Sequence, residues 1–244
     1  MAAIYLIRHG QASFGKADYD QLSEKGSEQS RLLGQFWQSM SAPDRIYSGD
    51  LLRHKQTLDN FIMGYQGKES SVTLHSGFNE FNHVELLTCY DRQWKNFADM
   101  SIAIGKKPAA NIRFQKEFSY ALERWVSGKH DHDYKESWTQ FKKRCVSALQ
   151  DVIEQALLAK KSAKESSMNN QHSKDICIFT SGGVIAVLIQ HVLGLSDEKT
   201  LMINQQVRNT SVTKLLFSEN DVNIDYFNDH GHLTSTGADW VTFR

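Results

Sequence analysis

Apolar residues follow two different spacings along the chain, and the alternation between them predicts the order of strands and helices. Short runs rich in β-forming residues occur at 3–7, 44–49 and 71–75. Between these runs, residues 23–40 and 50–65 carry apolar side chains at the three- and four-residue spacing of a helix that buries one face. A repeated strand–helix order is typical of a mostly parallel sheet with helices on its faces.

The second half of the chain continues this pattern. Residues 136–161 show the clearest helical spacing, and an apolar strand at 175–180 breaks at a glycine pair into a second apolar run. A short helix is expected near 196–206, followed by alternating strands at 211–218 and 221–227 that are expected to pair as a hairpin. These elements predict an α/β three-layer sandwich, in which helices cover both faces of a mostly parallel central sheet.

One segment interrupts the alternation. Residues 85–128 are rich in Trp, Phe, Lys and Arg, have little strand periodicity and include Pro108. We expect a helical insertion within a single domain that spans residues 1–244. Residues 162–174 are polar and are expected to form a surface loop.

Charge and cysteine content exclude several classes of function. Lys and Arg together number 28, as do Asp and Glu, so no overall field attracts nucleic acid or an anionic membrane. Three scattered cysteines form neither a metal-binding pair nor a disulfide framework, which is typical of a reducing compartment. We expect no signal peptide, and the sequence contains no apolar run of about 18 residues. We therefore expect a cytoplasmic protein without nucleic-acid or membrane partners. Any site that binds an anion must be formed by a few nearby charged residues rather than by the net charge of the chain.

The strand at 3–7 ends in Arg8, His9 and Gly10, a combination that suits phosphate chemistry. Open α/β sheets bind ligands at the carboxyl ends of their strands. Arginine offers a planar fork of donors to phosphate oxygens, and a neutral imidazole is a competent nucleophile toward phosphorus. The alternative interpretation of so short a motif is a buried histidine at a strand end, with the arginine in an unrelated ion pair.

Further motifs occur in an order that resembles the histidine phosphatase superfamily, which has the phosphoglycerate-mutase-like fold. The resemblance covers nearly the whole chain apart from the insertion. It rests on these stretches: "LIRHGQ", "LSEKGSEQSRLLG" (22–34), "IYSGDLLRHKQT" (46–57), "FNEF" (78–81), "ICIFTSGGVIAVL" and "VRNTSVTKL" (207–215).

The resemblance implies a reaction through a phosphohistidine. His9 is the expected nucleophile, Arg8 and Arg53 hold the phosphate oxygens, and Glu80 donates a proton to the leaving oxygen and then activates water. Two arginines suit this transfer because phosphoryl transfer depends mainly on positioning and charge stabilisation. No metal and no organic cofactor is expected, and the partner is a small phosphorylated substrate or inorganic phosphate. A surface ion pair is the alternative role for Arg53 and Glu80.

The sequence departs from the family pattern at the second catalytic turn. There the family usually has Ser-His-Gly, whereas this chain has Thr180, Ser181 and Gly182. A neutral hydroxyl thus replaces an imidazole, and the loss of one transition-state donor lowers a rate by roughly a hundred- to a thousandfold. Ser181 and Gly182 are still expected to bind a phosphate oxygen, helped by the N-terminus of the following helix.

A second departure follows "RHGQ". Where many members of the family carry a phosphate-contacting asparagine, this chain places Gly15, and Gln11 and Ser13 are left as candidate minor contacts. The Trp-Asn and Gly-Trp signature of the cofactor-dependent mutases is also absent. A phosphatase is therefore expected rather than a mutase.

Other candidate chemistry is weaker. Ser181 lacks the Gly-x-Ser-x-Gly pattern of a hydrolase elbow, and no Lys-Ser/Thr follows the glycines as a phosphate loop requires. The stretch "KHDHD" has the composition of a metal site through His130 and His132, but it equally fits a solvated loop. His232 is interpreted as structural, although it could approach the site. The resemblance implies that the insertion at 85–128 covers the site, as insertions after the third strand do in the family. Its aromatic residues are expected mostly in its core, with one or two lining the substrate mouth.

Together these features predict a metal-independent phosphomonoester phosphatase. The alternative is a weakly active or inactive member of the family that binds phosphorylated ligands without turning them over, which the serine at position 181 favours. The sequence predicts neither the substrate nor the oligomeric state.

Overall fold

The computed structural model describes residues 2–13, 20–67, 71–94, 110–165 and 175–243. The chain folds into two compact units. One consists of Met1–Glu80 with Cys145–Arg244, and the other of Phe81–Arg144. Gly15, Pro108 and residues 166–174 of the expected loop lie outside the described residues. Residues 162–165, which were also expected in that loop, instead form the last turn of a helix.

The first unit is built on one six-stranded sheet with the order β3-β2-β4-β1-β5-β6. Strands β3, β2, β4 and β1 are parallel, whereas β5 and β6 form an antiparallel hairpin at the edge next to β1. The prediction of a mostly parallel sheet and of the hairpin is thus confirmed. The strands are β1 (Ala2–Arg8), β2 (Arg45–Ser48), β3 (Val72–Leu74), β4 (Asp175–Thr180), β5 (Val212–Phe217) and β6 (Val222–Asp229).

Helices occur in the segments 23–40, 50–65 and 136–161, where the apolar spacing predicts them, whereas the short helix at 231–234 was not predicted. Ser23 begins the first helix as its N-cap, because its hydroxyl accepts a hydrogen bond of 3.0 Å from the Gly26 amide. The helices of this unit are α1 (Glu24–Trp37), α2 (Leu52–Tyr65), α7 (Gly182–Leu193), α8 (Asp197–Gln206) and α9 (Gly231–Thr234), with the greater part of α6 (Trp138–Glu165) and the 3-10 turns η1 (Ser76–Phe78) and η3 (Ala238–Trp240). No helix in the described part of the chain is both long and apolar enough to cross a membrane.

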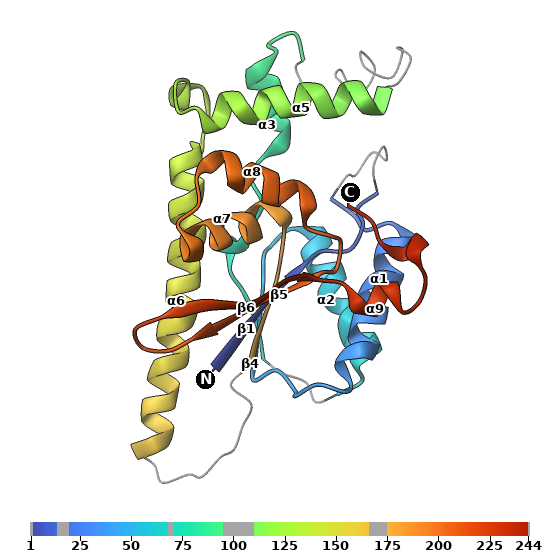
Figure 1. Ribbon diagram of the computed structural model, residues 1–244, viewed down its shortest axis with the longest axis vertical. Helices are drawn as coiled ribbons and strands as arrows, with labels where there is room; N and C mark the ends of the chain where they lie inside the picture. The colour runs from blue at the N-terminus through green and yellow to red at the C-terminus, as the bar shows by residue number, and fades with distance from the viewer. Residues whose placement is uncertain (1, 14–19, 68–70, 95–109, 166–174, 244) are drawn as a thin grey trace. The chain divides into compact units, whose positions relative to one another are not determined.

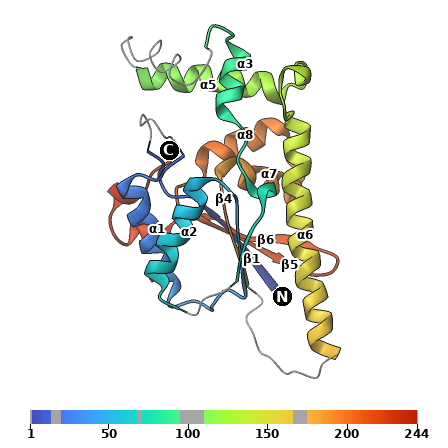
Figure 2. The same cartoon turned by 180° about the vertical axis from the view of Figure 1, so that it is seen from behind.

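Alternate side chains of the central strands face two different helical layers. On one face, the ring of Tyr5 packs edge-on against Trp37 of α1, with centroids 5.0 Å apart, and Trp37 packs in the same way on Phe61 of α2. On the other face, the Tyr47 hydroxyl donates a 3.0 Å hydrogen bond to Gln155 of α6. Figures 1 and 2 show α1 and α2 on one side of the sheet and α6 on the other, so the three-layer prediction is confirmed.

The register of β1 and β4 determines where the turns that follow these two strands lie. The two strands are parallel neighbours, and Arg8 at the end of β1 pairs with Thr180 at the end of β4. The carboxyl ends of parallel strands meet at one edge of the sheet. Residues that follow both strands are therefore brought to the same place, although they are far apart in the sequence.

The second unit is helical and contains α3 (His83–Tyr90), α5 (Ala110–Val126), the turn η2 (Asp131–Asp133) and the first residues of α6. Its core is aromatic: Trp125 packs on Trp138 with ring centroids 5.2 Å apart, and on Phe81 and Phe141. Because residues of α6 complete this core, the compact unit reaches beyond the segment 85–128 that the sequence indicated.

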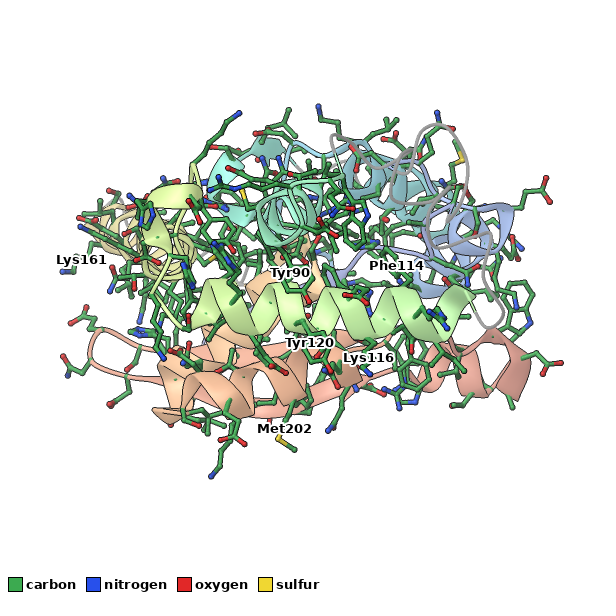
Figure 3. The ribbon with its side chains drawn as sticks, turned by 90° about the horizontal axis from the view of Figure 1, so that it is seen from above. Tyr90, Phe114, Lys116, Tyr120, Lys161 and Met202 are labelled. Atoms are coloured by element: carbon green, nitrogen blue, oxygen red, sulfur yellow. The ribbon has the colours of Figure 1, made fainter. Side chains whose placement is uncertain are left out.

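The two main helices of this second unit also meet through their tyrosines. Tyr90 of α3 and Tyr120 of α5, both labelled in Figure 3, are in contact, and their ring centroids are 6.4 Å apart. Lys116, one turn before Tyr120, places its ammonium group 5.8 Å from that ring. An aromatic contact thus contributes to the pairing of α3 with α5.

Candidate functional site

The backbone of Arg8 and His9 is fixed by hydrogen bonds to two segments of the chain. The His9 amide donates to the Thr180 carbonyl at 2.9 Å, which continues the β1–β4 pairing past the last strand residue. On the opposite side the Arg8 amide donates to Ser211, and the side-chain amide of buried Asn209 donates to the His9 carbonyl at 3.1 Å. The position of His9 is therefore set by β4 and by the segment that leads into β5.

The imidazole of His9 has a defined tautomer. Its Nδ1 lies 2.7 Å from the carbonyl oxygen of Gly10, and a carbonyl only accepts, so Nδ1 carries the proton and Nε2 keeps its lone pair. His9 as a whole residue is 7 % exposed. Burial lowers the pKa of His9 well below its usual 6.5, and the positive charges of Arg53 and Arg8 lower it further. His9 is thus a neutral base with Nε2 available.

Gly10 allows two helices to approach this histidine. A Cβ atom at position 10 would lie 2.3 Å from the carbonyl oxygen of Gly26, so α1 presses directly on the backbone here. The Gly10 amide donates to Thr57 Oγ1 at 3.0 Å, and that hydroxyl donates to the Arg53 carbonyl at 2.6 Å. The glycine of the "RHG" motif is therefore required by packing against α1 and α2.

Both predicted arginines lie beside His9, and both have protein partners. The Arg53 guanidinium is nearly buried, and its Nη1 lies 2.5 Å from Oδ1 of Asp20. The other Asp20 oxygen accepts a 2.7 Å hydrogen bond from the Leu52 amide, which satisfies the N-terminus of α2. The Arg8 guanidinium donates through Nη1 to the Val207 carbonyl. Positive charge is thus concentrated near His9, with one carboxylate against Arg53.

Glu80 is positioned by a loop that is fastened to the turn before α2. The Asn79 side chain accepts a 2.6 Å hydrogen bond from the Asp50 amide, and the Phe78 carbonyl accepts one of 2.7 Å from the Thr180 hydroxyl. Glu80 then accepts a hydrogen bond of 3.0 Å from the Gly183 amide at the start of α7. Its carboxylate therefore lies at the N-terminus of the helix that follows Ser181.

Ser181 is the N-cap residue of α7, but its hydroxyl does not cap that helix. The side chain is fully buried, and its Oγ lies 2.7 Å from Nε2 of His54, which is also fully buried. Gly182 follows in a confined place: a Cβ there would lie 2.9 Å from Asn204 and 3.5 Å from Nε of Arg8. The two residues predicted to bind phosphate thus lie beside Arg8 and a histidine that the sequence analysis did not select.

The two predicted minor contacts, Gln11 and Ser13, both form hydrogen bonds within the protein. The Gln11 side chain accepts a 3.0 Å hydrogen bond from the Ser23 hydroxyl at the start of α1. The Ser13 hydroxyl is buried and donates to the Leu22 carbonyl at 2.9 Å. Both residues therefore connect the loop after β1 to the segment that enters α1.

His232 is linked to the candidate site through one intervening residue, Thr210. The Thr210 hydroxyl donates to the Asn209 carbonyl, so its oxygen accepts from Nε2–H of His232 at 3.0 Å. Burial lowers the pKa of His232 to about 4, so it is neutral near pH 7. The Thr210 amide in turn donates to the Arg8 and His9 carbonyls. The structure thus places His232 behind the backbone of the site.

The stretch around His130 and His132 is organised by ion pairs. Asp133 is bound by the Arg124 guanidinium, which also donates to the Tyr134 hydroxyl at 2.7 Å. Within the described ranges, no group of three or more His, Cys, Asp or Glu side chains is arranged to hold a metal ion.

Three residues of the site were missed by the sequence analysis. His54 and Asp20 carried only weak signals, since one merely follows Arg53 and the other lies in a polar loop. Asn209 belongs to the motif at 207–215, but its bond to His9 depends on the β1–β5 pairing. Their contacts join parts of the chain that are distant in sequence, so no local pattern marks them.

The fold and the site together define an α/β protein that carries a neutral histidine and two arginines at the carboxyl edge of its sheet. The sequence profile of the histidine phosphatase superfamily (branch 1) matches residues 4–230, so the chain belongs to that superfamily. A comparison with curated proteins returned no match.

Solved structures share the fold at low sequence identity. The chain resembles phosphoglycerate mutase from Bacillus anthracis str. Sterne (TM-score 0.62, 17 % identity, 95 % of this chain and 94 % of the other). It also resembles the alpha-ribazole phosphatase of Shigella flexneri (0.61, 18 %, 93 % and 96 %). A third similar structure is mycobacterial glucosyl-3-phosphoglycerate phosphatase (0.56, 19 %, 93 % and 99 %). Relatives of this fold thus include both phosphatases and a mutase.

Proposed function

We propose that the protein is a metal-independent phosphomonoester phosphatase that acts through a phosphohistidine on His9. The observation that carries the proposal is the tautomer of His9: the Nδ1–H···O=C bond to Gly10 leaves an Nε2 lone pair beside two guanidinium groups. An imidazole held in this way does not need to lose a proton before it attacks phosphorus. Membership of the superfamily supports the same reaction.

The reaction has two steps. In the first, the Nε2 lone pair of His9 forms a bond to phosphorus while the bond to the ester oxygen breaks, and Glu80 gives that oxygen a proton. In the second, water attacks the phosphohistidine, its proton returns to Glu80, and the phosphorus–nitrogen bond breaks. Arg8 and Arg53 stabilise the charge on the phosphoryl oxygens in both steps. The proton-transfer role of Glu80 is supported by the position of its carboxylate, which accepts a hydrogen bond from the Gly183 amide at the start of the helix after Ser181.

The test is the release of phosphate from an aryl phosphate, together with trapping of an acid-labile phosphoenzyme. His9→Ala should abolish the phosphoenzyme and lower the rate by at least about a thousandfold, as loss of a nucleophile does. The matched control is His191→Ala, since His191 is exposed on α7. Turnover that survives His9→Ala would show that another group performs the chemistry.

A second function, phosphate binding without turnover, is favoured by one feature of the site. Position 181 carries a neutral hydroxyl, so a transition-state donor is missing while both arginines are kept. In that case phosphorylated ligands bind in a manner that depends on Arg8 and Arg53, and no phosphoenzyme forms. Equilibrium binding of inorganic phosphate, measured beside the turnover assay, separates the two functions.

A further inference from the structure

His54 and Ser181 form a buried hydrogen-bonded pair. Their side chains are both 0 % exposed, and Nε2 of His54 lies 2.7 Å from Oγ of Ser181. A serine at an N-cap normally accepts a hydrogen bond from its own helix, yet the Ser181 hydroxyl makes no such bond. This hydroxyl is therefore turned away from α7 and toward the imidazole.

The surroundings of the ring select its tautomer. Nδ1 of His54 is buried and has no hydrogen-bond partner among the described residues. A Cβ atom at Gly49 would lie 2.2 Å from this nitrogen, so a Cα hydrogen of Gly49 points at it. A bare nitrogen lone pair tolerates that hydrogen, whereas an N–H group would direct hydrogen against hydrogen. The proton is therefore on Nε2, which donates to Ser181 Oγ.

This donation leaves the hydroxyl hydrogen of Ser181 available for another acceptor. Ser181 comes directly after Thr180, whose carbonyl accepts from the His9 amide, so the serine lies at the same sheet edge as the nucleophile. The rings of His9 and His54 are 5.8 Å apart between centroids. A phosphoryl group on His9 would place oxygens, which are acceptors only, beside this hydroxyl.

We propose that His54 and Ser181 act as one unit, in which His54 Nε2–H holds Ser181 Oγ and directs the hydroxyl hydrogen to an oxygen of a phosphate bound at His9. In this unit Ser181 contacts the phosphate and His54 is a positioning residue. The inference rests on the phosphate site of the proposed function and assigns the donor that completes it. It also gives the serine a defined role where the family usually has a histidine.

The charge state of His54 agrees with this role. Burial and the adjacent Arg53 charge lower the pKa of His54 well below 6.5, so the ring remains neutral. The site therefore gains no positive charge from His54. Arg8 and Arg53 supply the positive charge, and the neutral pair supplies a donor with a fixed direction.

The experiment is a double-mutant cycle read out by the affinity for inorganic phosphate and for orthovanadate. Ser181→Ala and His54→Phe should each weaken binding by roughly ten- to a hundredfold, the usual effect of losing a hydrogen bond to a charged group. Because the two residues act together, the double variant should bind no more weakly than Ser181→Ala. His54→Gln, which keeps an N–H donor, should recover part of the loss. The control for ring substitution is His191→Phe on the exposed face of α7.

Several outcomes would overturn the inference. It fails if the two single effects multiply in the double variant, or if His54→Phe leaves anion affinity unchanged. Nitrogen-15 NMR of the wild-type protein must show a protonated Nε2 and a bare Nδ1 for His54. The His54 signals are assigned by their loss in His54→Phe and His54→Gln. The opposite tautomer contradicts it even if a variant folds poorly.

The same measurements distinguish this inference from the proposed function. Wild-type protein that binds orthovanadate but forms no phosphoenzyme removes the phosphatase proposal and leaves the cycle fully informative. Wild-type protein that binds neither anion overturns the pair as a phosphate donor.

Discussion

Asp20 and Arg53 are joined by an ion pair in which Oδ1 lies 2.5 Å from Nη1, and the same carboxylate accepts from the first amide of α2. The pair places one negative charge against an arginine that is expected to bind phosphate. A carboxylate that satisfies a guanidinium in this way both holds it in position and competes with an incoming anion. Asp20 therefore has two opposing effects that one substitution can separate.

Asp20→Asn should raise the affinity for inorganic phosphate several-fold and lower the free energy of unfolding by about 1 kcal/mol. The affinity rises because the negative charge of Asp20 no longer competes with phosphate for Arg53. Stability falls because the ion pair and the hydrogen bond to the N-terminus of α2 weaken. Titration calorimetry and urea unfolding measure the two quantities. The control is Asp59→Asn on the exposed side of α2. A fall in phosphate affinity would mean that Asp20 acts mainly by orienting Arg53.

Gly49→Ala should displace the imidazole of His54. The new Cβ would lie 2.2 Å from Nδ1 of His54 and 2.8 Å from Asn79 Oδ1, closer than atoms approach without a shift. Such overpacking should lower the free energy of unfolding by about 1–3 kcal/mol. The double variant Gly49→Ala/His54→Ala removes the clash, so its loss of stability should be smaller than the sum of the two single losses. Additive losses would show that some contact other than the one with His54 requires a glycine at position 49.

His232→Gln should make stability less dependent on pH on the acid side. The folded-state pKa of about 4 lies below the unfolded value of 6.5, so the unfolded chain binds the extra proton, and stability is lost as the pH falls from 6.5 to 4. One pKa unit corresponds to about 1.4 kcal/mol, so this contribution approaches about 3 kcal/mol. Urea unfolding in steps across this range measures it. The control for the substitution itself is His191→Gln, at an exposed site.

The imidazole of His9 should titrate well below pH 6.5 in the folded protein. Burial is the main cause, and the Arg53, Arg8 and His54 groups act in the same direction. NMR of the ring protons measures the titration without any assumption about turnover. Arg53→Gln should move the midpoint upward, because it removes the positive charge that lowers the pKa of His9 most. A wild-type midpoint at or above 6.5 would contradict the buried, neutral nucleophile.

Much of this fold can be predicted from local patterns. The helical spacing at 23–40 and the Ser23 cap predict α1, and the alternation near 211–227 predicts the β5–β6 hairpin. Such patterns are reliable because a helix or strand must bury one face of its own short segment. Five candidate site residues could also be chosen from the sequence, since each lies in a recognisable motif at a strand end or helix start: Arg8, His9, Arg53, Glu80 and Ser181.

The interior of the site could not be predicted in the same way. His54 and Ser181 are 127 residues apart, and their hydrogen bond exists only because α2 starts beside the end of β4. Asp20 reaches Arg53 across 33 residues, and Asn209 reaches His9 across 200. Parallel strand pairing brings these segments to one edge, and a polar side chain buried there must bond to whatever that edge provides. Local sequence therefore specifies which residues carry chemistry, whereas the packing of the sheet edge decides which partners tune them.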